Sequence, residues 1–349
     1  MKNTVEQAKG NNNDRKIADF RVKQAQDYSF KKKYAAVRAR EFYNHPEIAR
    51  NCYVAVGGLD SITLLLFLRS IGINIPAVSV SALEDKSIQA VHKALGVQTL
   101  KPQKSKIEVL KTLGWPILSK DSAKKINALQ NPTEENAVYR HAIITGIKGN
   151  GEFSKRMRLS KKWLKKFGGY ENEAEGVDYG KPDFAVSDQC CWFMKELPLN
   201  IYAKETGQFP YMGLMASEGG RRENALMING CNYISPGTKR SCPFAIFSRQ
   251  DLLTLALELN APVPEIYGEI VRDPDGTLKT TKAQRTGCSM CGFGIHLEKR
   301  PHRFDQLWGR NPGEWEMWMN HVDQLPDGTW YGWGHVLDYI GVEWREPWR

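Results

Sequence analysis

Residues 52–68 read Cys-Tyr-Val-Ala-Val-Gly-Gly-Leu-Asp-Ser-Ile-Thr-Leu-Leu-Leu-Phe-Leu, and this segment is the strongest indicator of the fold. The first five residues have strand character, Gly57 and Gly58 interrupt them, and a leucine-rich helix follows. A helix that begins directly after a strand presents unpaired N–H groups and a positive dipole end, which favour a phosphate group. The glycines lack a Cβ and let the backbone approach closely. Residues 57–61 are therefore predicted to form a phosphate-binding loop.

Two side chains of this loop can act on a bound phosphate. Asp60 can cap the helix or hold Mg²⁺, and Ser61 can cap it or bond to a phosphate oxygen. No Gly-Lys-Ser/Thr follows, which argues against the class of Walker-loop kinases and GTPases. The alternative is a tight strand–helix turn without a ligand.

The segments after this loop alternate between strand and helix. Strands are predicted at 76–81 and 97–100, with a helix at 85–95 between them, and further helices at 107–113 and 122–129. Such alternation is typical of an α/β fold with a parallel twisted sheet and helices on both faces. Ligands of these sheets lie beyond the carboxyl ends of the strands, where residues 57–61 are expected.

The composition sets the broad class of protein. The chain has 349 residues, 25% charged and 41% hydrophobic, which suits a globular α/β domain with extensions. We expect no membrane span and no signal peptide, since no apolar run approaches 18 residues. The seven cysteines then suggest a reducing, cytoplasmic location. The net charge of +10 favours anionic partners such as nucleotide, sulfate or nucleic acid.

Three regions are expected along the chain. Residues 1–46 form a helical N-terminal extension whose first fifteen residues are disordered. Residues 47–250 form the nucleotide-binding α/β domain. Residues 251–349 form a helical subdomain rich in cysteine and tryptophan, with seven of the ten tryptophans after residue 307. These rings are expected to pack into an aromatic core; stacking on nucleic-acid bases is the alternative.

A basic segment precedes an acidic linker at 168–180. Residues 155–166 hold seven lysines and arginines in twelve positions, with Trp163, Leu164 and Phe167 among or beside them. A basic stretch with aromatic residues suits a phosphate backbone. A solvated helix face is the alternative.

The cysteines form two clusters, Ser-Asp-Gln-Cys-Cys at 187–191 and Arg-Thr-Gly-Cys-Ser-Met-Cys at 285–291. A Cys-x-x-Cys can give two thiolates to one metal centre. Adjacent cysteines point apart, which suits the several irons of an iron–sulfur cluster better than a single zinc. A zinc site or a redox disulfide between Cys288 and Cys291 remains an alternative.

Several separate motifs carry a resemblance to a known family. From about residue 50 to its end the chain resembles the phosphoadenosine phosphosulfate (PAPS) reductase family, in its uncharacterised, often phage-borne branch. That family lies within the PP-loop ATP pyrophosphatase, or adenine nucleotide alpha-hydrolase-like, superfamily. The matching motifs are Gly-Gly-Leu-Asp-Ser (57–61), Leu-Ser-Lys-Lys-Trp (159–163), Ser-Asp-Gln-Cys-Cys (187–191), Gly-Leu-Met-Ala-Ser-Glu (213–218) with Arg222, Gly-Cys-Asn (230–232), Arg-Thr-Gly-Cys-x-x-Cys (285–291), His-Leu-Glu (296–298) and Arg-Phe (303–304).

The resemblance implies roles for individual residues. A [4Fe–4S] cluster would be held by Cys190, Cys191, Cys288 and Cys291, with Cys231 and Cys242 in reserve and Lys195 beside the cluster to offset its charge. The nucleotide would be bound by residues of the loop and of the next strand, with Asp60, Ser61 and Arg222 as the catalytic set. Its phosphates would meet Gly57, Gly58, Asp60 and Ser61, its adenosine Ser79 and Ser81, and its phosphate or sulfate Arg222.

Three departures from the family bear on the reaction. Val56 stands where the family usually has serine, and no cysteine follows Cys291 to act as the reductases' nucleophile. Residues 213–219 also lack an Arg and a Ser of the family's sulfate grip. We therefore expect ATP–Mg²⁺-dependent adenylation with sulfur transfer, with tRNA or DNA as the expected acceptor. Reduction of adenylyl sulfate or PAPS to sulfite, and a non-enzymatic nucleotide- or nucleic-acid-binding iron–sulfur module, are the alternatives. A sulfur or electron donor protein and a homodimer are further partners left open.

Overall fold

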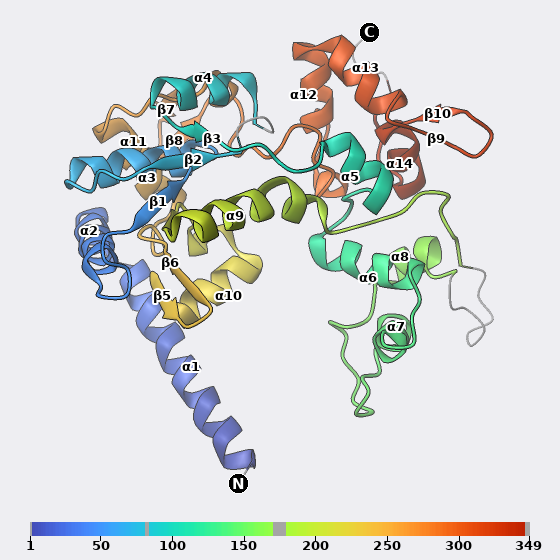
Figure 1. Cartoon of the computed structure of the whole chain (residues 1–349), viewed down its shortest axis with the longest axis horizontal. Helices are drawn as coiled ribbons and strands as arrows, with labels where there is room; N and C mark the ends of the chain where they lie inside the picture. Colours follow the sequence, from blue (N-terminus) through green and yellow to red (C-terminus); the bar gives the residue numbers. More distant parts are fainter. Residues whose placement is uncertain (1, 81–83, 170–178, 346–349) are drawn as a thin grey trace. The chain divides into compact units, whose positions relative to one another are not determined.

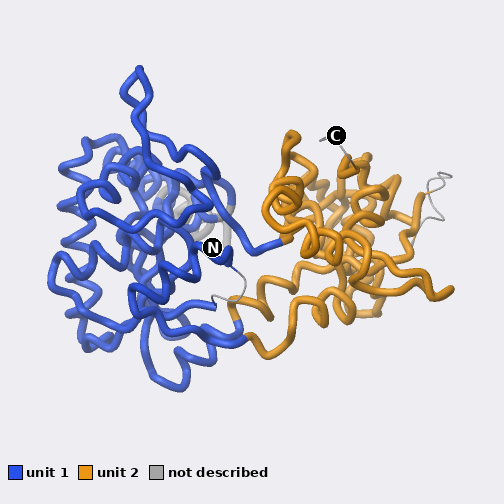
Figure 2. The backbone as a smooth tube through the Cα atoms, turned by 90° about the horizontal axis from the view of Figure 1, so that it is seen from above, with its two compact units in different colours: residues 1–101, 197–289 blue, residues 102–196, 290–349 orange. Residues whose placement is uncertain are grey.

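The computed structural model describes residues 2–80, 84–169 and 179–345, and it divides the chain into two compact units. Unit 1 comprises residues 1–101 and 197–289; unit 2 comprises residues 102–196 and 290–349 (Figure 2). Each unit therefore combines two distant stretches of sequence. This division differs from the expected boundaries after residues 46 and 250, because strands on both sides of residues 102–196 join one sheet.

Unit 1 contains a six-stranded sheet with the order β3-β2-β1-β4-β6-β5. All neighbouring strands are parallel except β5 and β6. The largely parallel sheet confirms the expected α/β class and puts β1 in the middle. The strands are β1 (Cys52–Ala55), β2 (Ala77–Ser79), β3 (Gln98–Thr99), β4 (Phe209–Met212), β5 (Asn232–Ser235) and β6 (Thr238–Ser241).

Helices cover both faces of this sheet (Figure 1). Cys52 and Val54 of β1 belong to the main core with α3, whereas Tyr53 packs edge-on against Tyr202 of α9, with ring centroids 5.2 Å apart. The helices of unit 1 are α1 (Lys2–Gln24), α2 (Tyr28–Asn44), α3 (Leu59–Ser70), α4 (Lys86–Ala94), α9 (Leu197–Thr206), α10 (Gly220–Asn229) and α11 (Arg249–Glu258), with a short hairpin of β7 (Ile270–Arg272) and β8 (Leu278–Thr280).

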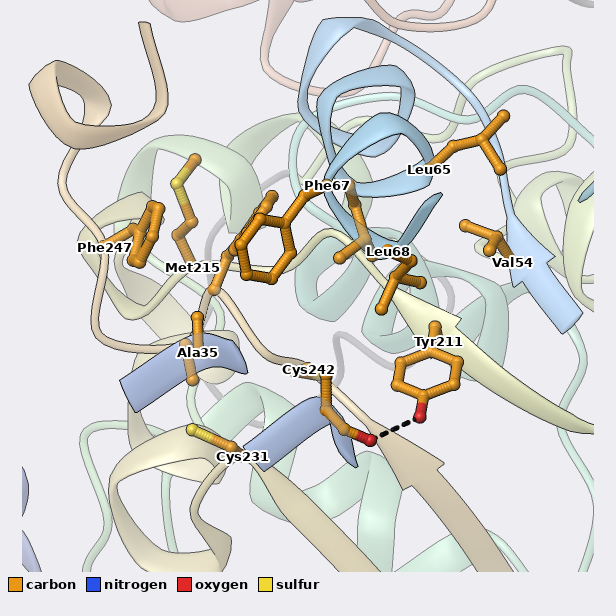
Figure 3. Packing of buried hydrophobic residues seen from close by; sticks show 14 of the residues in the cluster. Ala35, Val54, Leu65, Phe67, Leu68, Tyr211, Met215, Cys231, Cys242 and Phe247 are labelled. Carbon is orange, nitrogen blue, oxygen red and sulfur yellow. Dashed lines mark hydrogen bonds between the residues drawn. The ribbon is translucent and has the colours of Figure 1, made fainter. Parts of the chain in front are cut away.

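The N-terminal helices are part of the core of unit 1. Figure 3 shows Phe67 and Leu68 of α3 packed toward Tyr211 of β4. The Tyr211 hydroxyl donates to the carbonyl of Ala39 in α2 (2.7 Å). Helix α1 spans residues 2–24, where the first fifteen residues were expected to be disordered. Its C-terminal half is held because Phe20 is buried in the same core.

Unit 2 is mainly helical and is built around buried aromatic rings. Trp115 and Trp333 meet edge to face with centroids 4.8 Å apart, and Phe304 packs against Trp333. Trp318 is also buried, whereas Trp308 and Trp330 are exposed; Trp348 lies outside the described residues. The elements are α5 (Lys106–Leu113), α6 (Lys120–Gln130), α7 (Ala137–Thr145), α8 (Lys161–Phe167), the π-helix Trp192–Glu196, α12 (Arg303–Arg310), α13 (Pro312–Asn320), β9 (Asp323–Gln324), β10 (Trp330–Tyr331) and α14 (Trp333–Ile340).

Helices that cross a lipid bilayer are long and predominantly apolar. Across 2–80, 84–169 and 179–345, none combines the length and the apolar character needed to cross a membrane.

Candidate functional site: the loop between β1 and α3

The loop is closed by its own serine. Strand β1 ends at Ala55 and α3 begins at Leu59, with Gly58 as the N-cap residue. The Gly57 N–H donates to Ser61 Oγ (2.7 Å), and the Ser61 hydroxyl donates to the Gly58 carbonyl (3.0 Å). Ser61 therefore sets the shape of the turn, and its hydroxyl is buried within it.

Two backbone donors of the loop are left for a ligand. The amides of Ser61 and Ile62 donate to the Gly58 carbonyl (3.2 and 3.1 Å). Within the described part of the chain, the amides of Gly58 and Asp60 donate to no group. Both lie at the start of α3, where the helix dipole favours an anion. This is the donor pattern expected of a phosphate site.

Tyr267 covers the loop. Its hydroxyl accepts from the Leu59 N–H (3.1 Å), and burial raises its pKa, so it stays neutral. A Cβ on Gly58 would lie 2.3 Å from the Tyr267 hydroxyl oxygen, whereas a Cβ on Gly57 would meet nothing closer than 3.8 Å. Gly58 is therefore required by the close approach of Tyr267.

Asp60 faces an arginine. Arg249, the first residue of α11, donates to Asp60 Oδ1 (2.6 Å) and to the Gln284 carbonyl (2.9 Å). Burial raises the pKa of the Asp60 carboxyl, and the positive charges of Arg249 and Arg285 offset this only in part. The negative charge of Glu218 also raises the Asp60 pKa, and Glu84 Oε1 lies 3.8 Å from where a Cβ on Gly57 would be. The carboxylates of Asp60, Glu84 and Glu218 therefore lie near the loop together with the two guanidinium groups.

His92 supports the loop from beneath. This residue of α4 is buried, and its Nε2 lies 2.7 Å from the Gly57 carbonyl oxygen. A carbonyl only accepts, so Nε2 carries the proton. Gly213 lies against the other side, since a Cβ there would come 3.1 Å from the backbone of Asp60 and Ser61.

The remaining residues expected at the nucleotide lie at different places. Ser79 is buried at the carboxyl end of β2, beside β1. Ser81 lies outside the described residues. Arg222 is exposed on α10 and forms an ion pair with Glu218 one turn earlier. Lys195 belongs to unit 2, in the π-helix Trp192–Glu196.

No local sequence pattern points to Arg249, Tyr267 or His92 as residues of the site. Arg249 and Tyr267 lie 189 and 208 residues from their partners in the loop, and His92 lies 35 residues from Gly57. No motif spacing links such distant positions. The one available hint was the Ser248-Arg249 start of a helix after an apolar run.

The four expected cluster cysteines fall in both units. Cys190, Cys191 and Cys291 belong to unit 2, and Cys288 belongs to unit 1. Taking the described residues alone, no three or more His, Cys, Asp or Glu side chains form a group that could hold a metal ion. Thiolate groups are nevertheless the donor set that iron–sulfur clusters use.

Residues 115–118 of unit 2 form β-bridges with the chain just before Cys190 and with the chain just after Cys291. Trp115 forms a parallel bridge with Val186, and Leu118 forms one with Phe293. Val186 lies four residues before Cys190, and Phe293 lies two residues after Cys291. Residues 115–118 thus fix two cysteine-bearing segments that are far apart in sequence.

Burial separates the cysteines into two groups. Cys52, Cys231 and Cys242 lie in the core of unit 1, where burial raises their thiol pKa to about 12, 11 and 12. Cys191, Cys288 and Cys291 are only half-buried. Because metals bind the thiolate, the core position disfavours the reserve role expected for Cys231 and Cys242.

The basic segment, residues 155–166, was expected to present basic and aromatic side chains together, and the side chains that it exposes differ from that mixture. Trp163 and Phe167 are buried in the core of unit 2, so their rings do not face a ligand. The exposed basic residues are Lys155, Arg156, Lys161, Lys162 and Lys165. The exposed ring of this region is Phe153, which is 65% exposed and pairs with Ile147.

The fold and the loop together define an α/β protein with a largely parallel sheet and a glycine turn ahead of its first sheet helix. No protein-family model matches the sequence, and no curated protein matches it. Among solved structures, the chain is similar to phosphoadenylyl-sulfate (PAPS) reductase from Candida auris in its phosphate complex. The two share 12% identity at a TM-score of 0.35, over 70% of this chain and 89% of that chain. A likeness of this size has no bearing on ligand or reaction.

Proposed function

We propose that this chain is an enzyme that binds an adenine nucleotide at residues 57–61 and transfers its adenylyl group. The observation that carries the proposal is the pair of amides of Gly58 and Asp60 at the start of α3, which donate to no group among the described residues. Beside them stand a carboxylate able to hold Mg²⁺ and two arginines able to neutralise phosphate charge. Magnesium would lower the charge of the triphosphate.

The reaction supported by this arrangement is adenylation of an acceptor. An acceptor oxygen attacks the α-phosphorus of ATP, the bond from that phosphorus to the bridging oxygen breaks, and pyrophosphate leaves. The amides of Gly58 and Asp60 hold the phosphates, Ser61 keeps the turn closed, and Arg249 stabilises negative charge as it develops. The outer sulfur of a persulfide on a donor protein then attacks the adenylated carbon, and AMP leaves. A second thiol of that donor cleaves the resulting S–S bond, so that the sulfur stays on the acceptor and the donor keeps a disulfide.

The cysteines provide the proposed link to sulfur. Cys190, Cys191, Cys288 and Cys291 would hold a [4Fe–4S] cluster, which supplies electron transfer or sulfur handling when bound. Cys191, Cys288 and Cys291 are less buried than Cys231 and Cys242, which supports these three; Cys190 is itself buried and is chosen for its place beside Cys191. Cys→Ser variants of the four should lose iron and acid-labile sulfide from anaerobically purified protein. Cys231→Ser and Cys242→Ser should keep both; the opposite pattern would overturn the choice.

The acceptor proposed here is a nucleic acid. Five exposed lysine and arginine side chains of residues 155–165 lie in one stretch of unit 2, and three of them, Lys161, Lys162 and Lys165, belong to helix α8. A nearby exposed ring, Phe153, adds a surface on which a base can stack. Positive charge without buried carboxylate partners suits a phosphate backbone.

A pyrophosphate-release assay tests the proposal. Under anaerobic conditions, with ATP, Mg²⁺ and either tRNA or DNA, the wild type should release pyrophosphate and Asp60→Ala should not. Asp275→Ala, in an exposed turn of the same unit, is the control for loss of a carboxylate. Absence of turnover on every acceptor, together with sulfite release from PAPS, would favour sulfonucleotide reduction. Absence of both would leave a binding module.

A further inference from the structure

The Tyr267 hydroxyl lies between the phosphate loop and the segment that leads to Cys288. It accepts from the Leu59 N–H (3.1 Å) and shares a hydrogen bond with Thr286 Oγ1 (2.7 Å). Thr286 lies two residues before Cys288, and all four residues belong to unit 1. One buried hydroxyl therefore contacts both segments.

Arg249 makes a second link between the same two segments. One of its guanidinium nitrogens donates to Asp60 Oδ1 (2.6 Å), and the other donates to the Gln284 carbonyl (2.9 Å). In the loop, the two contacts fall on the adjacent residues 59 and 60. In the segment that leads to Cys288, they fall on residues 284 and 286. A shift of the loop therefore acts on the segment at two points.

The links rest on a packed frame. The Tyr267 ring is buried in a small cluster with Leu59, Ile88, Leu253 and Leu278. The turn after β8 is fixed to the same place, since the amides of Lys282 and Ala283 donate to the carbonyls of Tyr267 and Ile266 (3.0 and 3.1 Å). Rigid surroundings of this kind transmit a displacement instead of absorbing it.

We infer that Tyr267 and Arg249 are positioning residues that couple occupancy of the phosphate loop to the segment 284–288, and so to Cys288. The inference rests on the proposed function, because it requires a nucleotide at the loop. The unpaired amides of Gly58 and Asp60 flank Leu59, whose own amide donates to Tyr267. An anion bound there fixes residues 58–60, and the two links fix the segment in turn.

Hydrogen–deuterium exchange of the full chain tests the coupling, with and without ATP and Mg²⁺, and separately with PAPS. In the wild type, nucleotide should protect residues 56–62 and also residues 284–291. In Tyr267→Phe, which keeps the buried ring, the Leu59 amide loses its acceptor, but nucleotide should still protect the other amides of residues 56–62. The protection at 284–291 should shrink by roughly threefold to tenfold, the effect of one lost hydrogen bond.

Two further variants keep the test decisive. Thr286→Val removes the same hydrogen bond from the half-buried side and should reproduce the result if Tyr267→Phe fails to fold. Tyr211→Phe removes another buried tyrosine hydrogen bond of unit 1 and should leave both protected regions unchanged. Equal protection of residues 284–291 in wild type, Tyr267→Phe and Thr286→Val would overturn the coupling. No protection of residues 56–62 by either nucleotide would instead overturn the proposed function.

Discussion

Asp60 illustrates how a single residue in the site responds to pH. Burial raises its folded-state pKa above the unfolded value of 3.8, so the folded protein holds this proton more tightly. The protonated Asp60 carboxyl therefore makes a stabilising contribution to the free energy of unfolding. This contribution is fully present below pH 3.8 and is lost as pH rises through the folded-state pKa. The amide of Asp60→Asn does not ionise in this pH range, so the variant lacks this pH-dependent contribution to stability.

The expected result is a pH-dependent difference between the two proteins. In urea unfolding, the stability of the wild type relative to Asp60→Asn should fall as pH rises from about 3.8, and it should then level off. A difference that stays constant across this window, or one that grows with pH, would contradict the raised pKa. Binding of ATP–Mg²⁺ at neutral pH should be lost in Asp60→Asn, because the amide cannot hold the metal.

Gly58 provides a second prediction at the same scale. Gly58→Ala should destabilise the protein by about 1–3 kcal/mol, because its Cβ overlaps the Tyr267 hydroxyl. In the Tyr267→Phe background this loss should be smaller, since the overlapping atom is gone. Gly57→Ala, whose Cβ has room, is the control. Urea unfolding of the wild type, Gly58→Ala, Tyr267→Phe and the double variant measures the coupling between the two positions. Additive losses of stability would rule out the close contact.

Contiguous residues of the site could be predicted and distant ones could not. Gly57, Gly58, Asp60 and Ser61 form one turn, so local sequence specifies both their geometry and their donors. Arg249 and Tyr267 reach the loop only through the tertiary fold, which no single-sequence pattern reports. The resemblance implies that Arg222 meets the phosphate; in the structure its exposed side chain on α10 forms an ion pair with Glu218, and the phosphate role stays a prediction.

Among the elements, the strand–helix alternation of residues 52–100 could be read from hydrophobic periodicity. The predicted strands and helices there correspond to β1, α3, β2, α4 and β3. Periodicity could not show that β4 pairs with β1, because residues 102–196 separate the two strands. Helix α1 was missed at its start, since its polar composition has no apolar stripe to indicate a buried face.

A buried ion pair joins two elements of unit 1 and supports Arg249. Lys31 of α2 lies 2.9 Å from Asp251 of α11, with both side chains 9% exposed. Asp251 also completes the capping box with Ser248, one residue before Arg249. Lys31→Met should cost about 3–5 kcal/mol, because it leaves the Asp251 charge buried without its partner.

The neighbouring residue supplies a matched control. Lys32→Met removes a partner of the exposed Lys32–Glu258 pair and should cost about 0–1 kcal/mol. Thermal unfolding of the two variants compares them directly. Losses of equal size would show that the Lys31 pair is no more important than a surface contact.

At the scale of the whole molecule, the net charge of +10 is an average over unequal regions. If residues 155–165 bind nucleic acid, replacing Lys161, Lys162 and Lys165 by Gln should weaken binding at every sequence. It should also lower the slope of log affinity against log salt by about 2–3. Replacing Lys86, Lys93 and Lys101, three exposed lysines of unit 1, changes the net charge equally and should leave the slope nearly unchanged.

Fluorescence anisotropy with a labelled single-stranded oligonucleotide, titrated at several salt concentrations, measures both slopes. Equal losses from the two triple variants would mean that binding follows overall charge and not the surface of unit 2. Phe153→Ala should lower affinity without altering the slope, because stacking releases no counterions.

The division of unit 1 into residues 1–101 and 197–289 has a consequence for its folding during translation. When β1, β2 and β3 have emerged, the edge of β1 that will receive β4 is still bare, because residues 102–196 come first. At roughly 5–20 residues per second, translation of that insertion takes about 5–20 seconds. A nascent chain paused there exposes the unpaired edge of an apolar strand, and such an edge favours aggregation unless a chaperone covers it.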